Sequence, residues 1–443
     1  MAGPPFSTLA QWLAWQETLH PQAIDLRLER LQALLGRLEE WRRGPPFAVV
    51  TVGGTNGKGS SVAFLDAMLR AGGYRVGSYT SPHLHRYTER IRIGGQDIAD
   101  DELCRIFARL DSVRGDIPLT YFEWGTLAAF EHFRQAQVQV AVLEVGLGGR
   151  LDAVNVLDAD AALVTAVDID HVEWLGPDRE SIGYEKAGIF RPGRPAVCAD
   201  PQPPASLLAH ARHIGARLYR AGVDYQYERD GGGWSWRSDT VQLSGLPLPR
   251  LAGEHQLANA AGALMALQAL SERLPLTPDA LRQGIARAWV GGRFQVLPGA
   301  VEWILDVAHN PHGAAALARS LEARPCAGRT LAVLGMLSGK DAAGVAQAMA
   351  AAVDRWYPAA LGGARGRGAA ELLAALRTGG IIAPAMTFAD VATACRTAAA
   401  DARAGDRVVV FGSFYTVAEA LAAGLPVQDR PTDETASRRM GFG

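Results

Sequence analysis

Short apolar runs alternate with segments of helical periodicity along most of the chain. Residues 47–52 (FAVVTV), 138–146 (VQVAVLEVG) and 161–167 (AALVTAV) are the clearest runs, and they are typical of strands buried on both faces of a sheet. Residues 60–73 follow the first run with apolar side chains at helical spacing and end at a Gly-Gly pair. The alternation predicts βαβ units and a mostly parallel sheet.

Three other segments depart from this rhythm. The first forty residues are helical in pattern, with leucines at helical spacing. Residues 223–250 alternate aromatic and polar side chains around three consecutive glycines, which predicts an antiparallel hairpin at the edge of the sheet. An Ala-rich helix is expected from about residue 254.

Glycine and proline cluster without periodicity in residues 291–300 (GGRFQVLPGA), which predicts a domain boundary. Beyond it the strand and helix alternation starts again, so a second, smaller α/β domain with its own sheet is expected. We expect one domain over 1–292 and a second over 293–427. The polar residues 428–443 are predicted to be disordered.

Composition excludes several classes of protein. The 443 residues carry a formal net charge of −2 without a Lys/Arg-rich run, so the electrostatic signature of a nucleic-acid-binding protein is missing. No apolar stretch is long enough to cross a membrane, and the first residues lack the pattern of a signal peptide, so a cytoplasmic protein is expected. The four cysteines lie far apart and suggest neither a zinc site nor a disulfide framework.

A glycine-rich loop at residues 50–61 (VTVGGTNGKGSS) carries the strongest chemical signal. It differs from the usual P-loop spelling, because Gly59 follows Lys58 and the hydroxyl arrives one position later, as Ser60. The loop lies between a predicted strand and a predicted helix, where backbone N–H groups and a helix N-terminus face an anion. Lys58 is expected to reach terminal phosphates and Ser60 to bind Mg²⁺; the alternative is a turn that binds nothing.

Polar side chains follow the next predicted strands. Glu144 ends one strand, and Asp168, Asp170 and His171 follow the next. Ligands of open α/β sheets gather at the carboxyl ends of strands, so a carboxylate there suits Mg²⁺. Each residue also has an ordinary interpretation: Glu144 as a capping or salt-bridged acid and His171 as a satisfied polar residue. Lys186 in ESIGYEKAGIF fits a surface lysine better than a functional one on this evidence alone.

The second predicted domain has its own polar cluster. Asp306, His309 and Asn310 follow a strand in ILDVAHNP, and Arg293 lies at the domain boundary. Such a set beside a helix N-terminus suits the ribose and phosphates of a nucleotide. Singly, each is equally well explained as a turn residue. Only as a set do they favour ATP bound with contributions from both domains.

These motifs together resemble those of a known family. GTNGKGS, TSPHL, LTYFEWGT, LEVGLGGRLDA, DHVEWLG, EKAGIFR, GRFQ and DVAHNP occur in the order seen in the bifunctional dihydrofolate synthase/folylpolyglutamate synthase family, from about residue 8 to 425. The Mur peptidoglycan ligases are more distant relatives. The resemblance implies an α/β fold of two domains: a Mur-ligase-like domain with a phosphate loop on a mostly parallel sheet, and a smaller Rossmann-like C-terminal domain.

The resemblance also implies an activity and a set of site residues. The activity is ATP-dependent addition of L-glutamate to dihydropteroate and to the glutamate tail of reduced folates, with Mg²⁺ as the metal and two ions expected. Separately, the sequence has no obvious interface stripe, so a monomer is expected. Lys58, Lys186, Asp306 and His309 match catalytic positions, and Lys186 matches a lysine that is carbamylated to N6-carboxylysine. ATP would be bound by Thr55, Asn56, Gly57, Lys58, Gly59, Ser60, Asn259, Arg293, Asp306 and His309. Metal ligands would be Ser60, Ser81, Glu144 and His171, and the substrate would contact Ser81, Thr120, Phe122, Leu151, Asp152, Ala153 and Ser413.

Other functions remain open on sequence grounds. Polyglutamylation alone, without dihydrofolate synthesis, would use the same site, although YFEWGT resembles the bifunctional members. A Mur-type ligase would use the same loop with a UDP-linked substrate. A GTPase-type switch is disfavoured because the chain lacks an N-K-x-D motif, and a plain nucleotide-binding scaffold would not explain the polar cluster of the second domain.

Overall fold

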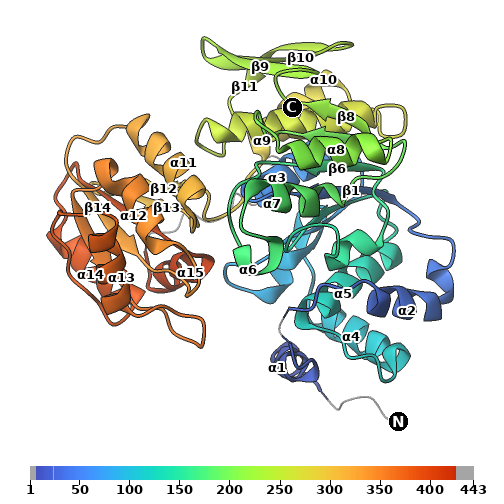
Figure 1. The fold of residues 1–443 in the computed structure, drawn as a ribbon, viewed down its shortest axis with the longest axis horizontal. Coiled ribbons are helices and arrows are strands. Elements are labelled where there is room, and N and C mark those ends of the chain that lie inside the picture. The colour runs from blue at the N-terminus through green and yellow to red at the C-terminus, as the bar shows by residue number, and fades with distance from the viewer. Residues whose placement is uncertain (1–5, 23, 426–443) are drawn as a thin grey trace, which may run out of the picture. The chain divides into compact units, whose positions relative to one another are not determined.

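A computed structural model describes residues 6–22 and 24–425, so the predicted disordered segment 428–443 lies outside the described residues. The chain divides into two compact units, Met1–Gly291 and Gly292–Gly443. Each unit is built on its own sheet (Figure 1).

The first unit contains an eight-stranded sheet in the order β4-β3-β2-β5-β1-β6-β7-β8. All neighbouring strands from β2 through β5, β1, β6 and β7 to β8 pair in parallel. Beyond β2, the strands β3 and β4 form an antiparallel edge of the sheet. The strands are β1 (Ala48–Gly53), β2 (Val76–Tyr79), β3 (Ile91–Ile93), β4 (Gln96–Asp97), β5 (Val140–Glu144), β6 (Ala161–Val164), β7 (Pro195–Cys198) and β8 (Arg217–Arg220).

Helices cover both faces of this sheet, as the unbroken apolar runs require. Alternate residues of β1 show the division: Val49 faces one core, and Val50 and Val52 face the other. The helices of the first face are α1 (Leu9–Leu19), α2 (Glu29–Arg37), α4 (Asp100–Arg114), α5 (Tyr121–Gln135), α7 (Arg179–Ala187) and α8 (Ala205–His213). Those of the second are α3 (Lys58–Ala71), α9 (His255–Ala269) and α10 (Pro278–Arg287).

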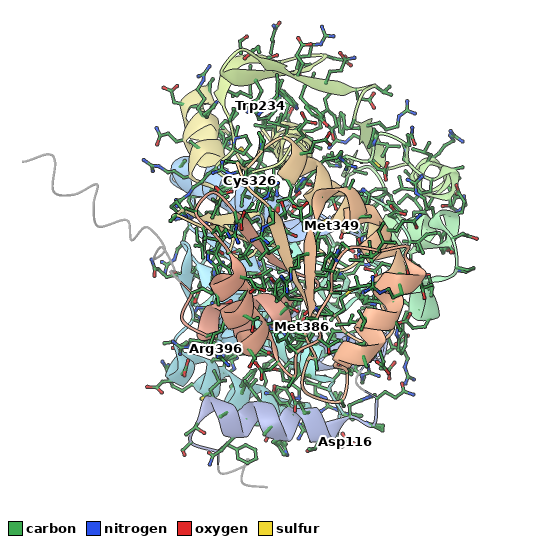
Figure 2. All side chains as sticks on the ribbon, turned by 90° about the vertical axis from the view of Figure 1, so that its left-hand side faces the viewer. Asp116, Trp234, Cys326, Met349, Met386 and Arg396 are labelled. Carbon is green, nitrogen blue, oxygen red and sulfur yellow. The ribbon has the colours of Figure 1, made fainter. Side chains whose placement is uncertain are left out.

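The expected hairpin of residues 223–250 is instead a separate three-stranded antiparallel sheet, with the order β11-β10-β9. The strands are β9 (Tyr225–Asp230), β10 (Gly233–Ser238) and β11 (Gln242–Pro247). Trp234 and Trp236 on β10 are buried in the same core as α9, so this sheet lies over the helices rather than extending the main sheet (Figures 1 and 2). The predicted antiparallel pairing around the glycines is confirmed by β9 and β10, whereas its predicted place at the edge of the main sheet was wrong, because the aromatic face packs on helices.

The second unit holds a five-stranded sheet in the order β12-β13-β16-β14-β15, parallel except for β12. Its strands are β12 (Gln295–Leu297), β13 (Glu302–Leu305), β14 (Thr330–Leu334), β15 (Arg355–Pro358) and β16 (Arg407–Phe411). Its helices are α11 (Pro311–Glu322), α12 (Ala342–Met349), α13 (Ala369–Thr378), α14 (Val391–Asp401) and α15 (Phe414–Ala422). Met349 of α12 is buried in this unit, whereas Met386 is exposed (Figure 2). The mixed α/β fold of two sheets agrees with the predicted fold class.

A glycine at the contact between α10 and α3 gives a test of this packing. A Cβ on Gly284 would lie 2.3 Å from Cα of Met68, so Gly284→Ala must push α10 away from α3. We expect a loss of about 1–3 kcal/mol in the free energy of unfolding, measured by chemical denaturation. Gly36→Ala in α2 is the matched control, since nothing lies within 4 Å of its Cβ position. It should stabilise by about 0.4–1 kcal/mol, and equal effects of the two changes would contradict the packing argument.

Candidate active site

The predicted phosphate loop joins the end of β1 to the start of α3, as expected. Gly57 precedes the helix in the left-handed region at φ +92°, and Gly54 has φ +143°. A Cβ on Gly54 would lie 1.8 Å from Oγ1 of Thr165, and one on Gly57 would lie 2.4 Å from Oδ1 of Asn259. Both positions therefore require glycine for backbone conformation and for space.

The loop is held by residues that follow β6. The Thr165 hydroxyl donates to the backbone carbonyl of Asn56 at 2.7 Å and lies 3.1 Å from that of Gly53. Thr55 N–H donates to the Ala166 carbonyl at 2.7 Å, and the Thr55 hydroxyl donates to the Asp168 carbonyl at 2.9 Å. Sequence reasoning missed Thr165, whose position directly after a buried strand was the available signal.

Lys58 is the first residue of α3, and its side chain turns back over the loop. Its Nζ donates to the carbonyl of Gly54 at 3.0 Å and to that of Thr55 at 3.2 Å. Ser60 is buried in the first turn of the same helix. The ammonium group therefore lies beside the loop backbone, where it can meet a bound anion.

Ser81 and Glu144 come together at the carboxyl ends of the adjacent strands β2 and β5. The backbone N–H of Ser81 donates to Oε2 of Glu144 at 3.1 Å, and Glu144 is 3 % exposed. In the sheet register Glu144 is opposite Val52, close to the start of the phosphate loop. The carboxyl ends of β2 and β5 thus place a buried carboxylate and a serine next to the loop.

His171 lies after β6 at the start of the short helix α6 (Val172–Leu175), with a left-handed backbone at φ +52°. Its ring nitrogens are 4.0 Å from carboxylate oxygens of Asp170 and Glu173. No group of three or more His, Cys, Asp or Glu residues arranged to hold a metal occurs within 6–22 and 24–425. The predicted donor set has two residues of these types, Glu144 and His171, and its other members are serines.

Lys186 is buried on α7, unlike the surface lysine that its sequence context favoured. Burial lowers the pKa of its amine to about 7, with a further contribution from the positive charge of Lys58. Asp170 and Asp152 act in the opposite direction. The structure thereby brings Lys58, Lys186, Asp152 and Asp170 within electrostatic reach of one another.

A second part of the site forms where the glycine turn after β5 meets α5. Asp152 caps the short 3₁₀ helix Ala153–Val156 and accepts N–H groups of Leu147 at 2.8 Å and Val154 at 3.0 Å. Burial raises the pKa of its carboxyl to about 6, although these hydrogen bonds oppose the shift. A Cβ on Gly146 would lie 2.6 Å from the ring of Phe122, so the turn packs directly on α5.

Thr120 caps the start of α5, where Phe122 also lies. The Glu123 carboxylate accepts the Thr120 N–H at 2.7 Å, and the Thr120 hydroxyl accepts the Glu123 N–H at 3.3 Å. The structure therefore groups the predicted substrate residues Thr120, Phe122, Asp152 and Ala153, while Leu151 is half-buried in the same turn. The sequence did not single out Glu123, although its place three residues after Thr120 is the signature of a capping box.

Asn259 reaches the phosphate loop from α9. Its Oδ1 faces Gly57, and its Nδ2 donates to Oε1 of Gln256 at 3.0 Å. Gln256 fixes the amide orientation and was not predicted. The Ala-rich helix expected from about residue 254 is thus α9, which begins at His255 and contributes directly to the loop environment.

In the second unit, Asp306 follows β13 and is half-buried. Its two carboxylate oxygens accept the backbone N–H groups of Phe294 and Ala308, both at 2.7 Å. Burial raises the pKa of this carboxyl, whereas the nearby Arg293 and His309 lower it. Asp306 therefore joins the backbone before β12 to the backbone after β13, and Arg293 and His309 lie close enough to act on its charge.

The remaining predicted residues of this unit lie nearby. The Arg293 guanidinium carbon is 5.0 Å from the ring centre of Phe414, the first residue of α15. Ser413 caps α15 by accepting the Thr416 N–H at 3.0 Å, and Nδ1 of His309 lies 2.9 Å from the carbonyl oxygen of Val307. Arg293, Asp306, His309 and Ser413 thus belong to one end of the second sheet.

Comparison with known proteins identifies the fold. Residues 52–267 match the model of the Mur ligase middle domain, and residues 292–414 match that of the Mur ligase, glutamate ligase domain. The phosphate loop on this sheet, together with both matched domains, makes the chain an ATP-dependent ligase with the domain plan of the Mur ligases. No helix in the described part of the chain is long and apolar enough to cross a membrane.

Individual relatives narrow the class. The dihydrofolate synthase/folylpolyglutamate synthase of Escherichia coli is 48% identical over 415 residues, which cover 94% of this chain and 95% of the relative. The structure of E. coli FolC in complex with DHPP and ADP has a TM-score of 0.89 at 47% identity and covers 94% of this chain and 97% of its own. A bifunctional relative with Mn, AMPPNP and L-glutamate bound has a TM-score of 0.87 at 46% identity and covers 96% and 99%. The chain belongs to the dihydrofolate synthase/folylpolyglutamate synthase family.

The buried amine of Lys186 predicts a specific pH dependence of stability. Its folded pKa of about 7 lies below the ordinary value of 10.5, so between these values the unfolded chain binds a proton that the folded chain does not. This difference makes the free energy of unfolding rise with pH over that window. In carbonate-free buffer, Lys186→Met should be more stable than the original chain near pH 7, and this advantage should shrink as pH rises toward 10. Parallel stability curves for the two proteins would refute the depressed pKa.

Proposed function

We propose that this chain uses ATP to join L-glutamate by an amide bond to dihydropteroate and to the glutamate tail of reduced folates. The observation that carries the proposal is the grouping around the phosphate loop, in a chain of this family: Glu144 lies opposite Val52 at the start of the loop, and buried Lys186 lies within electrostatic reach of Lys58. The bound ligands named for two relatives, ADP with DHPP and AMPPNP with Mn and L-glutamate, match the predicted ligand classes.

The first step activates a carboxylate, which by itself has no good leaving group. An oxygen of the acceptor carboxylate attacks the γ-phosphorus of ATP, the bond to the β,γ-bridging oxygen breaks, and ADP leaves. The loop of Thr55, Asn56, Gly57, Lys58, Gly59 and Ser60 would bind the phosphates, with the Lys58 ammonium near the transferred charge. Asn259, which faces Gly57, would contribute to the same nucleotide site.

The second step forms the amide. The neutral amine of L-glutamate attacks the acyl phosphate, the tetrahedral intermediate expels phosphate, and the amine loses its proton. Arg293, Asp306 and His309 are proposed to contact ATP, and Ser413 the acceptor substrate. For Asp306 the doubly hydrogen-bonded carboxylate supports a role in holding Arg293 and His309 as well.

Ser60, Ser81, Glu144 and His171 would hold Mg²⁺, and two ions are proposed. The buried carboxylate of Glu144 next to the loop fits such a site, because Mg²⁺ prefers oxygen ligands, and the backbone N–H of Ser81 holds this carboxylate in place. A bound divalent cation would spread the negative charge of the phosphates during transfer.

Lys186 is proposed to react with carbon dioxide and form a carbamate. With a pKa of about 7, a large share of this amine is neutral at physiological pH, and the neutral amine is the form that attacks carbon dioxide. The product would place a negative charge where the neutral amine stood, within reach of the positive charge of Lys58. Carbon-13 NMR after addition of labelled bicarbonate should show a carbamate signal. The signal should be absent from Lys186→Met, and its absence from the original chain would end the proposal.

The pterin ring of the acceptor is assigned to the pocket of Thr120, Phe122, Leu151, Asp152 and Ala153. The Phe122 ring offers an apolar face, and a buried carboxylate such as that of Asp152 suits the N–H edge of a pterin. We further propose domains at 1–292 and 293–427 and a monomer in solution. Light scattering that gives twice the chain mass of 47.2 kDa would contradict the monomer.

Release of ADP tests the function directly. The purified chain is given ATP, Mg²⁺ and L-glutamate, with dihydropteroate in one set and tetrahydrofolate in another. Turnover is expected with both, because both acceptors present a carboxylate and a pterin. Turnover with tetrahydrofolate alone would limit the activity to polyglutamylation and reject the assigned pocket. Failure with both, combined with binding of a UDP-linked substrate, would favour the Mur-type alternative.

A further inference from the structure

A buried ion-pair network joins α2 to the start of α5. Arg30 of α2 donates to Glu123 from Nη2 at 2.9 Å and from Nε at 3.2 Å, and to Oδ2 of Asp25 from Nη1 at 2.8 Å. The exposed fractions of these three side chains are 13 %, 3 % and 6 %. These contacts thereby hold α2, near the N-terminus, against the first turn of α5, which begins more than ninety residues later in the chain.

Glu123 has a second task in the same place. The carboxylate that receives Arg30 also closes the capping box of α5 through the Thr120 N–H. The first turn of α5 carries Thr120 and Phe122, and Phe122 packs against Gly146 in the turn that leads to Asp152. A displacement of Arg30 would therefore move the first turn of α5 and change the geometry of the proposed pterin pocket.

Asp25 holds the other side of the guanidinium. Hydrogen bonds from Arg27 and then Arg30 lower the pKa of the Asp25 carboxyl to about 2, so it stays ionised at physiological pH. Arg27 donates to both Asp25 oxygens and His20 lies 3.3 Å away. The Arg30 fork is thus oriented by carboxylates from two directions.

Such a network contributes little to the free energy of unfolding, since the cost of removing its charges from water can exceed their attraction. It does fix the position of one element relative to another, because the planar guanidinium group binds carboxylates in few geometries. We propose that Arg30 is a positioning residue for the acceptor substrate: it sets the start of α5 and thereby the pterin pocket. This inference rests on the proposed function and names no direct contact between Arg30 and the substrate.

The test separates positioning from stability. Arg30→Met leaves the Glu123 carboxylate buried without its cation, so both stability and the pocket should suffer. The double variant Arg30→Met/Glu123→Gln removes both charges and keeps a residue able to complete the capping box. We expect both variants to raise KM for dihydropteroate by about tenfold or more, since small displacements in a site are costly, while KM for ATP stays within about twofold. The melting temperature should recover in the double variant although KM does not.

Arg37→Met is the matched control in the same helix, because Arg37 donates to carbonyls of Val113 and Arg114 rather than to α5. It should leave KM for dihydropteroate unchanged. Recovery of KM together with the melting temperature in the double variant would show a purely structural role and overturn the inference. An unchanged KM in Arg30→Met would do the same. Lack of turnover of dihydropteroate by the original chain would instead reject the proposed function.

Discussion

The hydrogen bond from the Thr165 hydroxyl to the backbone of the phosphate loop is the contact on which the first unit's site depends. It joins the end of β6 to the loop that leaves β1, at the point where these parallel strands finish. Because Oγ1 occupies the space in which a Cβ on Gly54 would lie, glycine and threonine fit as a pair. The loop conformation is thus set by the adjoining strand as well as by its own glycines, and its N–H groups are arranged before any anion arrives.

The basic groups at this loop are lysine amines, whose protonation can change on burial in a way that an arginine guanidinium does not allow. The sequence contains three lysines, and two of them, Lys58 and Lys186, belong to this site. A guanidinium keeps its proton under all physiological conditions, whereas an amine can lose it when buried. Burial and the charge of Lys58 both favour the neutral form of Lys186, so one amine serves as a cation while the other remains available for chemistry.

The sequence predicted those features that local pattern determines. Apolar runs located the central strands, and glycine spacing with Lys58 located the loop, because both signals are contained in a few consecutive residues. The antiparallel edge of β3 and β4 was missed because these strands are only three and two residues long. The sheet of β9 to β11 was misplaced because alternation shows that one face is buried but not which element covers it. Lys186 looked like a surface residue from its neighbours, since its burial comes from the packing of α7 rather than from the sequence around it.

Carboxylates in both units share one mode of action, which is to hold backbone rather than to add stability. Asp306 accepts one backbone N–H from the residue before β12 and one from the segment after β13, Asp152 accepts two in the turn after β5, and Glu123 joins a helix cap to Arg30. Desolvation raises the pKa of Asp306 and Asp152, so ionisation of either carboxyl costs free energy that only their hydrogen bonds and nearby cations offset. An apolar residue would avoid that cost but would leave the donor N–H groups unsatisfied and the turns free to move. The desolvation free energy of these carboxylates therefore opposes folding, and in return their hydrogen bonds fix the turns that carry the site residues.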